Sequence, residues 1–203
     1  KSDNLHISQG WLDMHVNFGQ PGFEQRETIE NGLNVAANGG YTEVLLMPNT
    51  NPSIDNSSMI DFIKSFSKKH IVNIQVAGNL TMNQEGKNIV EIHDMTKNGC
   101  IAFTDDKKSI QNNELMKIAL LYMKNSDALL MNYPNDIKMQ NKGVINEGKI
   151  STQLGLKGIP NIAEEMMLDR DISLCKYTEG KIHESYISTE KSVDKIKQAK
   201  EEG

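Results

Sequence analysis

The chain has 203 residues, of which 37% are hydrophobic and 24% charged, and its 22 Lys and Arg against 27 Asp and Glu give a formal net charge of −5. This composition is typical of a globular protein and excludes collagen, coiled coils and disordered chains. The acidic balance and the 5% of aromatic residues provide neither a basic surface for phosphates nor stacking platforms for bases, so we expect no nucleic-acid partner.

Short apolar segments rich in β-branched residues alternate with segments of helical periodicity along almost the whole chain. The predicted strands are residues 11–18, 42–47, 71–77, 100–104, 128–131 and 181–187. The predicted helices, one after each strand, are residues 28–38, 57–68, 88–98, 113–124, 162–177 and 193–202. This alternation predicts an α/β fold of six βα units around a parallel sheet.

Some boundaries of these elements carry local signals. Asn38-Gly39-Gly40 and Asn98-Gly99 are typical helix ends, because glycine readily adopts the backbone conformation found there. Ser192 is predicted to cap the last helix with its hydroxyl group.

The longest connection separates the fifth predicted strand from the sixth. Residues 133–160 are rich in Asn, Lys and Gly and lack helical periodicity, which predicts a long loop at the C-terminal end of the fifth strand. In an α/β barrel this face carries the active site.

Six βα units do not close an eight-stranded barrel, and a parallel sheet left open exposes two unpaired edges. We therefore expect either an open sheet or an incomplete barrel. An open doubly wound sheet normally carries a glycine-rich phosphate loop after its first strand, and the sequence contains neither G-x-G-x-x-G nor G-x-x-x-x-G-K-[ST].

Asp13, His15 and Asn17 alternate at the end of the first predicted strand, which places the three side chains on one face. Two histidines spaced as H-x-H would both point toward zinc, but the second position here is Asn17, whose amide binds zinc poorly. His15 is therefore a candidate metal ligand, and the alternative is a structural histidine.

Further polar residues end the later strands. Asp105 and Asp106 follow the fourth strand, where adjacent carboxylates either bind a metal ion or begin an Asx turn. Asn132 follows the fifth strand, and His183 and Tyr186 belong to the sixth. Because the chain has only five histidines, a histidine-rich binuclear zinc site cannot be assembled from it.

Nucleophilic catalysis is poorly supported by the sequence. There is no G-x-S-x-G motif, and neither Cys100 nor Cys175 has an obvious histidine partner. The absence of a C-x-x-C spacing favours two buried thiols in a reducing, cytoplasmic location. No apolar run approaches the roughly 18 residues of a membrane span, so we expect no membrane segment.

An ordered series of motifs extends from Gly10 to Gly203. The series begins with Gly10-Trp11-Leu12-Asp13-Met14-His15-Val16-Asn17-Phe18-Gly19-Gln20-Pro21-Gly22 and continues with Glu30-Asn31-Gly32, Gly39-Gly40, Met47-Pro48-Asn49-Thr50-Asn51-Pro52, Ala102-Phe103-Thr104-Asp105-Asp106, Asn146-Glu147-Gly148, Ser151-Thr152, Gly155-Leu156, Gly158-Ile159-Pro160, Ala163-Glu164-Glu165, Arg170-Asp171, Ile187-Ser188-Thr189 and Ser192-Val193. The first motif resembles G-[FW]-x-D-x-H-V-H-F-R-x-P-G of the dihydroorotases, which are cyclic amidohydrolases of the amidohydrolase superfamily.

This resemblance implies a TIM-like (β/α)8 barrel of the amidohydrolase type. About six of its βα units fall within this chain, as a single partial barrel domain over residues 1–203. The resemblance also implies zinc as cofactor and the interconversion of dihydroorotate and carbamoyl aspartate in pyrimidine biosynthesis. The family's catalytic aspartate belongs to the eighth strand, beyond Gly203, so no catalytic residue is assigned in this chain.

The resemblance also carries over the metal-binding positions. The family's histidine ligands correspond to His15, Asn17, Asn132 and Tyr186, and its strand-four carboxylate corresponds best to Asp105, although the sequence does not separate Asp105 from Asp106. Only His15 and Asp105 keep metal-binding groups, so we expect zinc to be absent or weakly bound.

Two positions are implied in substrate binding. Asn49 matches a substrate-binding asparagine of the family, and Asn17 is assigned beside it. The arginine that pairs with the substrate carboxylate in the family is replaced by Gly19, which removes both its charge and its two-pronged geometry.

Three hypotheses of function follow. The leading one is a degenerate dihydroorotase-like scaffold or binding protein, which associates as a homo-oligomer or with a partner of the aspartate carbamoyltransferase type. The second is an active metal-dependent amidohydrolase with a rebuilt site of His15, Asp105, Asn132 and His183. The third is metal-free binding of a small ureide by Asn17, Asn49, Asn132 and Tyr186.

Overall fold

The computed structural model describes residues 4, 6–68, 70–126 and 128–203. Its strands are β1 Trp11–Val16, β2 Tyr41–Leu46, β3 Asn73–Gly78, β4 Cys100–Phe103, β5 Leu129–Asn132, β6 Ile145–Asn146, β7 Gly158–Ile159 and β8 Ile182–Glu184. Its helices are α1 Ile29–Asn38, α2 Ser57–Ser67, the 3-10 helix η1 Met82–Gln84, α3 Ile92–Lys97, α4 Asn113–Met123, α5 Ile137–Gln140, α6 Lys149–Leu154, α7 Ile162–Thr178 and α8 Glu190–Glu201.

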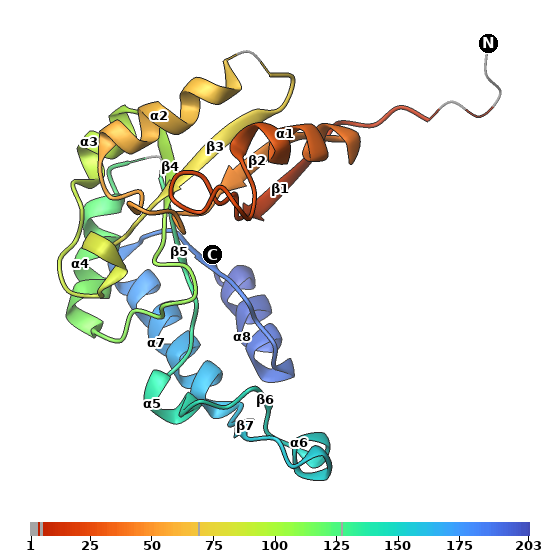
Figure 1. Ribbon diagram of the computed structural model, residues 1–203. Coiled ribbons are helices and arrows are strands. Elements are labelled where there is room, and N and C mark those ends of the chain that lie inside the picture. The colour runs from red at the N-terminus through yellow and green to blue at the C-terminus, as the bar shows by residue number, and fades with distance from the viewer. Residues whose placement is uncertain (1–3, 5, 69, 127) are drawn as a thin grey trace.

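The described strands form one six-stranded sheet in the order β1-β2-β3-β4-β5-β8, and every pairing in it is parallel. Figure 1 shows this sheet as a curved wall with α2, α3, α4 and α7 along its outer side. The predicted α/β fold of six βα units is confirmed. β1 and β8 are the edge strands of the sheet.

Alternation along the strands divides the buried residues between two faces of the sheet. Leu46, Val76 and Leu130 belong to the large cluster that packs against the helices. The neighbouring residues Met47 and Met131 belong to a smaller cluster on the other, concave face. Side chains that follow the strand ends and continue the alternation of Met47 and Met131 therefore point over the concave face.

Two predicted helices begin elsewhere than expected. The α3 helix begins at Ile92 rather than at Asn88, because the backbone of residues 88–91 pairs with the preceding segment, as in the hydrogen bond from Val90 N to Leu80 O. The prediction that Ser192 caps the last helix is wrong: α8 begins three residues before the predicted Val193, and the Thr189 hydroxyl accepts from Ser192 N at 3.3 Å.

Residues 133–160, predicted as a long loop after the fifth strand, contain four short elements. This segment contains α5 and α6, and the two short strands β6 and β7 pair in parallel. The carboxylate of Asp136 caps α5 by accepting from Lys138 N and Met139 N, which gives a four-residue helix despite the absence of helical periodicity. In Figure 1 the segment projects from the C-terminal end of β5.

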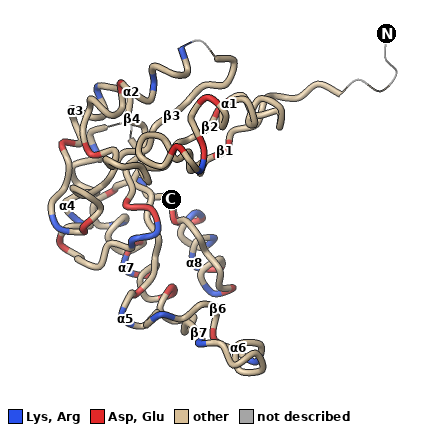
Figure 2. Tube along the Cα trace, viewed as in Figure 1, with Lys and Arg blue, Asp and Glu red and all other residues tan. Residues whose placement is uncertain are grey.

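The last two helices are joined by side chains of opposite charge. Figure 2 shows basic and acidic residues mixed along α7 and α8. Lys195 on α8 contacts Asp169 on α7 at 2.6 Å, and Lys191 lies 3.8 Å from Glu165. Across the described ranges, no helix has the length and apolar character needed to cross a membrane.

Candidate functional site at the strand ends

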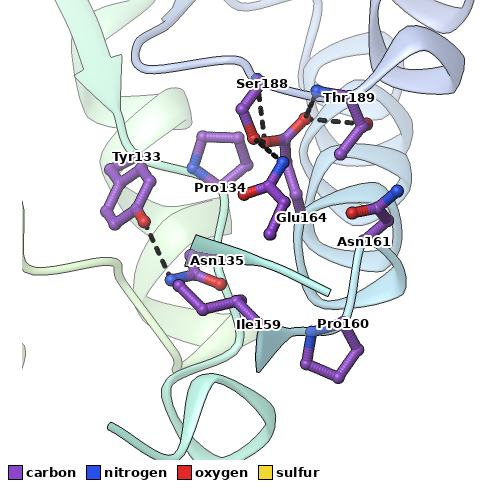
Figure 3. Close-up of a pocket in the computed structure, with 10 residues that line it drawn as sticks. Tyr133, Pro134, Asn135, Ile159, Pro160, Asn161, Glu164, Ser188 and Thr189 are labelled. Carbon is purple, nitrogen blue, oxygen red and sulfur yellow. Dashed lines mark hydrogen bonds between the residues drawn. The ribbon is translucent and has the colours of Figure 1, made fainter. Parts of the chain in front are cut away.

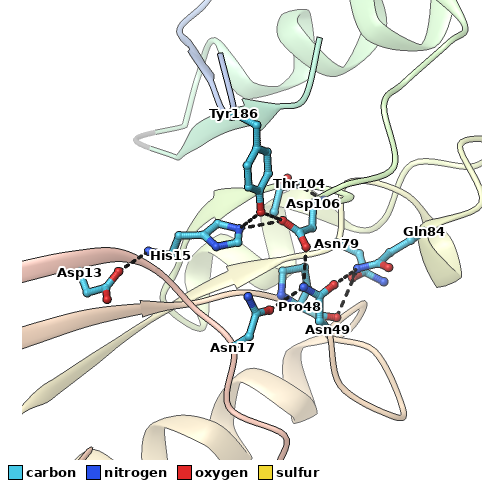
Figure 4. A network of polar contacts seen from close by, with 10 residues as sticks. All are labelled: Asp13, His15, Asn17, Pro48, Asn49, Asn79, Gln84, Thr104, Asp106 and Tyr186. Atoms are coloured by element: carbon cyan, nitrogen blue, oxygen red, sulfur yellow. Dashed lines mark hydrogen bonds and ion pairs between the residues drawn. The ribbon is translucent and has the colours of Figure 1, made fainter. Parts of the chain in front are cut away.

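Polar side chains from five strands meet above the concave face of the sheet (Figure 4). We call His15, Asn17, Asn49, Asn79, Gln84, Asp106 and Tyr186 the polar network. Its members lie in β1 or follow β1, β2, β3, β4 and β8, so residues far apart in sequence converge at the carboxyl ends of parallel strands. This is the edge at which α/β folds build binding sites.

Asp106 lies at the centre of the polar network. Its Oδ1 atom lies 2.7 Å from His15 Nε2 and accepts from the Tyr186 hydroxyl at 2.8 Å, while Oδ2 accepts from Asn49 Nδ2 at 2.6 Å. Burial alone would raise the pKa of Asp106, but the hydrogen bonds from His15, Asn49 and Tyr186 outweigh it and hold the pKa at about 2. Asp106 is therefore a buried, ionised carboxylate at neutral pH.

The turn after β4 separates the two neighbouring aspartates. Asp106 has a φ of 51°, and its backbone N–H donates to the Thr104 hydroxyl at 2.9 Å. Asp105 instead accepts from Leu80 N at 3.0 Å, from Thr81 N at 2.9 Å and from the Thr81 hydroxyl. The structure thus brings Asp106 into the network and points Asp105 toward the segment after β3, so the metal role assigned to Asp105 stays a prediction.

Asn17 and Asn49, the two predicted substrate-binding residues, contact each other. Asn49 Nδ2 donates to Asn17 Oδ1 at 2.6 Å as well as to Asp106. Gln84, a residue that sequence reasoning missed, donates from Nε2 to Asn49 Oδ1 at 3.4 Å and to Asn79 Oδ1 at 3.3 Å. It ends the short 3-10 helix η1 after the third strand, and no periodic signal marks it, because its φ of 55° is not that of a regular helix or strand.

Tyr186 connects the network to the aromatic residue that follows β5. Its ring packs edge-on against His15 at 5.2 Å and against Tyr133 at 5.5 Å between centroids. Sequence reasoning proposed Asn132 rather than Tyr133 from this strand. Tyr133 continues the alternation of Met131, which belongs to the concave cluster, so the strand register was the signal that could have identified it.

Asn132 points to the opposite face of the sheet. Its amide donates to Asp171 Oδ2 on α7 at 2.8 Å, and Arg170 holds Asp171 Oδ1 at 2.6 Å. The predicted meeting of Asn132 with Asn17, Asn49 and Tyr186 is therefore wrong. The reason is the period of two along a strand, which sends neighbouring residues to opposite faces.

Glu184 lies in the same buried cluster behind the sheet. Within the described residues, neither of its carboxylate oxygens has a hydrogen-bond partner, although both are inaccessible to solvent. Burial, followed by the charge of Asp171, raises the pKa of Glu184 to about 9. His183 was predicted to belong to a rebuilt enzyme site. Burial and the charge of Lys200 lower its pKa. Within the described residues, His183 makes no hydrogen bond to the polar network.

A hollow separate from the polar network lies between Tyr133 and the start of α8 (Figure 3). Glu164 on α7 lines this hollow. Its carboxylate accepts four hydrogen bonds at 2.7 to 3.1 Å, from the backbone N–H and the hydroxyl of both Ser188 and Thr189. These bonds outweigh burial and lower the pKa of Glu164. Because the carboxylate is satisfied by its own chain, it fixes the turn before α8.

The donor set of the polar network does not fit a catalytic zinc ion. In residues 4, 6–68, 70–126 and 128–203, no three His, Cys, Asp or Glu side chains gather in a group that could hold a metal. His15 and Asp106 bring an imidazole and a carboxylate together, but both Asp106 oxygens already accept hydrogen bonds. The other members are amides and a phenol, which are weaker ligands for zinc.

Comparison with known proteins agrees with this strand-end arrangement. A profile of the family described as Dihydro-orotase-like matches residues 6–192. The chain belongs to the dihydroorotase-like family. A dihydroorotase of Thermoanaerobacter sp. (strain X514) is 43% identical over 199 residues, which are 98% of this chain and 46% of the relative. A dihydroorotase of Caldanaerobacter subterraneus subsp. tengcongensis is 40% identical over 203 residues, or 47% of its length. The chain thus spans about half the length of these curated relatives.

Solved structures confirm the fold of this dihydroorotase-like chain as a partial TIM-type barrel. L-hydantoinase (dihydropyrimidinase) from Arthrobacter aurescens aligns with a TM-score of 0.76 and 17% identity, over 96% of this chain and 45% of that one. Dihydroorotase from Saccharomyces cerevisiae, solved in complex with 5-fluoroorotic acid, aligns with a TM-score of 0.65 and 14% identity, over 95% and 51%. At these identities the likeness shows the fold alone.

Gly19, where the resemblance places the family's arginine, lies in a tight turn of the dihydroorotase-like chain. Its N–H donates to Glu27 O at 2.9 Å, and its carbonyl accepts from Phe23 N at 2.7 Å. A Cβ atom at this position would lie 2.1 Å from Phe23 O. In this conformation of the turn, any side chain at this position would force the backbone to shift, and not only an arginine.

Proposed function

We propose that this chain is part of a dihydroorotase-like protein that binds a small ureide through hydrogen bonds and does not hold a catalytic zinc ion. The observation that carries the proposal is the state of Asp106. Its two oxygens are engaged by His15, Tyr186 and Asn49 at 2.6 to 2.8 Å, so the residues expected to hold a metal satisfy one another.

The chemistry of the network supports a ureide as the ligand class. Amide groups of Asn17, Asn49 and Gln84 and the hydroxyl of Tyr186 offer donors and acceptors of the kind that pair with the N–H and C=O groups of a urea. A site of this kind fixes orientation with a few polar groups and needs no ion. The expected place of action is pyrimidine metabolism in the cytoplasm.

The second candidate is an active amidohydrolase, and the relatives of about 40% identity that are named dihydroorotase favour it. In this case, His15 and Asp106 would hold a metal after Asp106 releases Tyr186 or Asn49. Zinc would then supply an activated water for attack on the cyclic amide.

Association with a partner is the remaining part of the proposal. The edge strands β1 and β8 each have a neighbouring strand on one side only in the described sheet, and proteins usually protect such edges from pairing with other chains. Further chain, a second copy or a partner of the aspartate carbamoyltransferase type would each cover them. Native mass spectrometry distinguishes these cases by the mass of the assembly.

The deciding experiment combines metal analysis with ligand binding. The protein is purified with and without added zinc, and its zinc content, its melting temperature with dihydroorotate or carbamoyl aspartate, and its ring-opening activity are measured. We expect substoichiometric zinc, no turnover and a higher melting temperature with ligand, since ligand at about 100 times its Kd adds about 2.7 kcal/mol of stability.

Stoichiometric zinc with ring-opening activity that is lost in His15→Ala would overturn the proposal in favour of the enzyme. His70→Ala is the matched control, because His70 lies away from the network and contacts Asn34 through Nε2 at 3.3 Å. If neither ureide raises the melting temperature and no zinc is bound, the binding function fails as well.

A further inference from the structure

Lys107 follows Asp106 directly and lies at the border of the polar network. Its Nζ atom lies 5.7 Å from the centroid of the Tyr186 ring, and the residue is exposed to solvent. The ion pairs of the described chain are all formed by other side chains. The ammonium group is therefore held near the site by the aromatic ring while it remains accessible to a ligand.

Two acidic residues lie in or beside the network. Asp106 is ionised at its centre, and Asp13 borders it, with Oδ1 accepting from His15 N at 2.9 Å. Lys108, the next cation along the chain, lies beside Asp105 and acts on that carboxyl, which points away from the network. An anionic ligand that reaches the network would be repelled by the two acids unless a cation were placed against it.

We propose that Lys107 is a specificity-determining residue that selects ureides carrying a carboxylate, with its ammonium binding the carboxylate while the network binds the urea group. This inference rests on the proposed ureide-binding function and adds the charge of the ligand. A single ammonium at a solvated border attracts an anion without a fixed fork geometry, so it tolerates more than one position of the carboxylate.

The position of Lys107 in the fold supports this role. Lys107 follows Asp106 in the turn where Asp106 has a positive φ. The residue at the centre of the network and the cation proposed to bind the carboxylate of the ligand are therefore adjacent in the chain. The ammonium lies near the Tyr186 ring, and the hydroxyl of the same residue contacts Asp106 and His15. A ligand bound against Tyr186 would therefore meet both the hydrogen-bonding groups of the network and the cation.

The test uses two cyclic ureides that differ in one carboxylate, dihydroorotate and dihydrouracil. Their affinities are measured by isothermal titration calorimetry for the unmodified protein, Lys107→Met, Lys107→Arg and the control Lys108→Met. We expect Lys107→Met to weaken dihydroorotate binding by about five- to tenfold and to leave dihydrouracil unchanged, since a partly solvated ion pair contributes a modest free energy. Lys107→Arg keeps the charge and is expected to retain most of the affinity.

The salt dependence gives a second reading of the same interaction. Raising the ionic strength should weaken dihydroorotate binding in the unmodified protein and much less in Lys107→Met. Equal losses for both ligands, or equal losses in Lys107→Met and Lys108→Met, would overturn the proposal for Lys107 while leaving ureide binding in place. Failure of both ligands to bind the unmodified protein would instead overturn the proposed function and this inference with it.

Discussion

The hydroxyl of Tyr186 lies 2.6 Å from Nε2 of His15, although the two residues belong to opposite edges of the sheet. His15 lies in β1, and Tyr186 follows β8, with four strands between them. Both groups also contact Oδ1 of Asp106, which follows β4 near the middle of the sheet. Three polar side chains thus hold the curved sheet together across its concave face.

The first prediction concerns this cross-sheet contact. Tyr186→Phe removes the hydroxyl but keeps the ring, so Asp106 loses one donor and the edges lose their link. We expect the free energy of unfolding to fall by about 1.5–3 kcal/mol, as is usual for a hydrogen bond to a charged group. Urea denaturation measures this change.

The control for this change is Tyr177→Phe, whose ring is 76% exposed at the end of α7. An unfolding free energy for Tyr186→Phe equal to that of Tyr177→Phe would contradict the role given to the hydroxyl. A double-mutant cycle with Asp106→Asn should show a coupling of at least about 0.5 kcal/mol if the two groups interact as described.

The second prediction concerns acid stability. Despite its burial, the pKa of Asp106 is about 2, below its ordinary value of 3.8, because His15, Asn49 and Tyr186 stabilise the ionised form. A depressed pKa of the folded state adds stability above pH 3.8, and this stability is lost as the pH falls toward 2. In Asp106→Asn this loss should be absent, so its stability should fall less steeply between these pH values.

The expected difference is about 1–2 kcal/mol after allowance for partial screening by solvent. Unfolding by urea at pH 2.5, 4 and 6 measures it, with Asp61→Asn on the exposed side of α2 as control. Parallel pH profiles for Asp106→Asn and the unmodified protein would show that the network does not depend on the charge of Asp106.

The fold was largely predictable because its signals are local and repeated. Apolar β-branched segments gave all six strands of the large sheet, and each was followed by a helix. The short strands in the segment 133–160 were not predictable, because β6 and β7 have two residues each, too few for an alternating pattern.

The site was predictable in part, and the errors share one cause. Of the four residues in the third hypothesis, Asn17, Asn49 and Tyr186 lie in the polar network, and Asn132 does not. The choice between Asp105 and Asp106, however, depends on a left-handed turn, and the face of Asn132 depends on strand register. A shift of one residue reverses the direction of a side chain, and neither composition nor motif spacing fixes position that finely.

The third prediction concerns the buried acid behind the sheet. Burial and the neighbouring Asp171 raise the pKa of Glu184 to about 9, so the folded chain keeps it protonated at neutral pH. A pKa raised above the ordinary 4.5 means that stability is greatest below pH 4.5 and decreases as the pH rises toward 9. Glu184→Gln should remove this decrease.

We expect Glu184→Gln to gain on the order of 2 kcal/mol relative to the unmodified protein between pH 5 and pH 8. Guanidinium denaturation at the two pH values measures the gain, and Glu201→Gln on the exposed face of α8 is the control. A gain that does not change with pH would show that Glu184 is ionised in the folded state.

The last prediction concerns Gly19. A Cβ atom at this position would lie 2.1 Å from Phe23 O and 2.8 Å from Phe23 C, and the turn cannot open without breaking the hydrogen bonds of Gly19 to Phe23 and Glu27. We expect Gly19→Ala to cost about 2 kcal/mol or more, in the range of severe steric substitutions. Gly148→Ala is the control, because nothing lies within 4 Å of a Cβ there.

Gly19→Arg should be at least as destabilised and should not improve dihydroorotate binding, since the Cβ atom of the arginine meets the same clash with Phe23. A Gly19→Arg protein of unchanged melting temperature that binds dihydroorotate more tightly would show that the turn rearranges freely and that this position can still read the charge of the ligand.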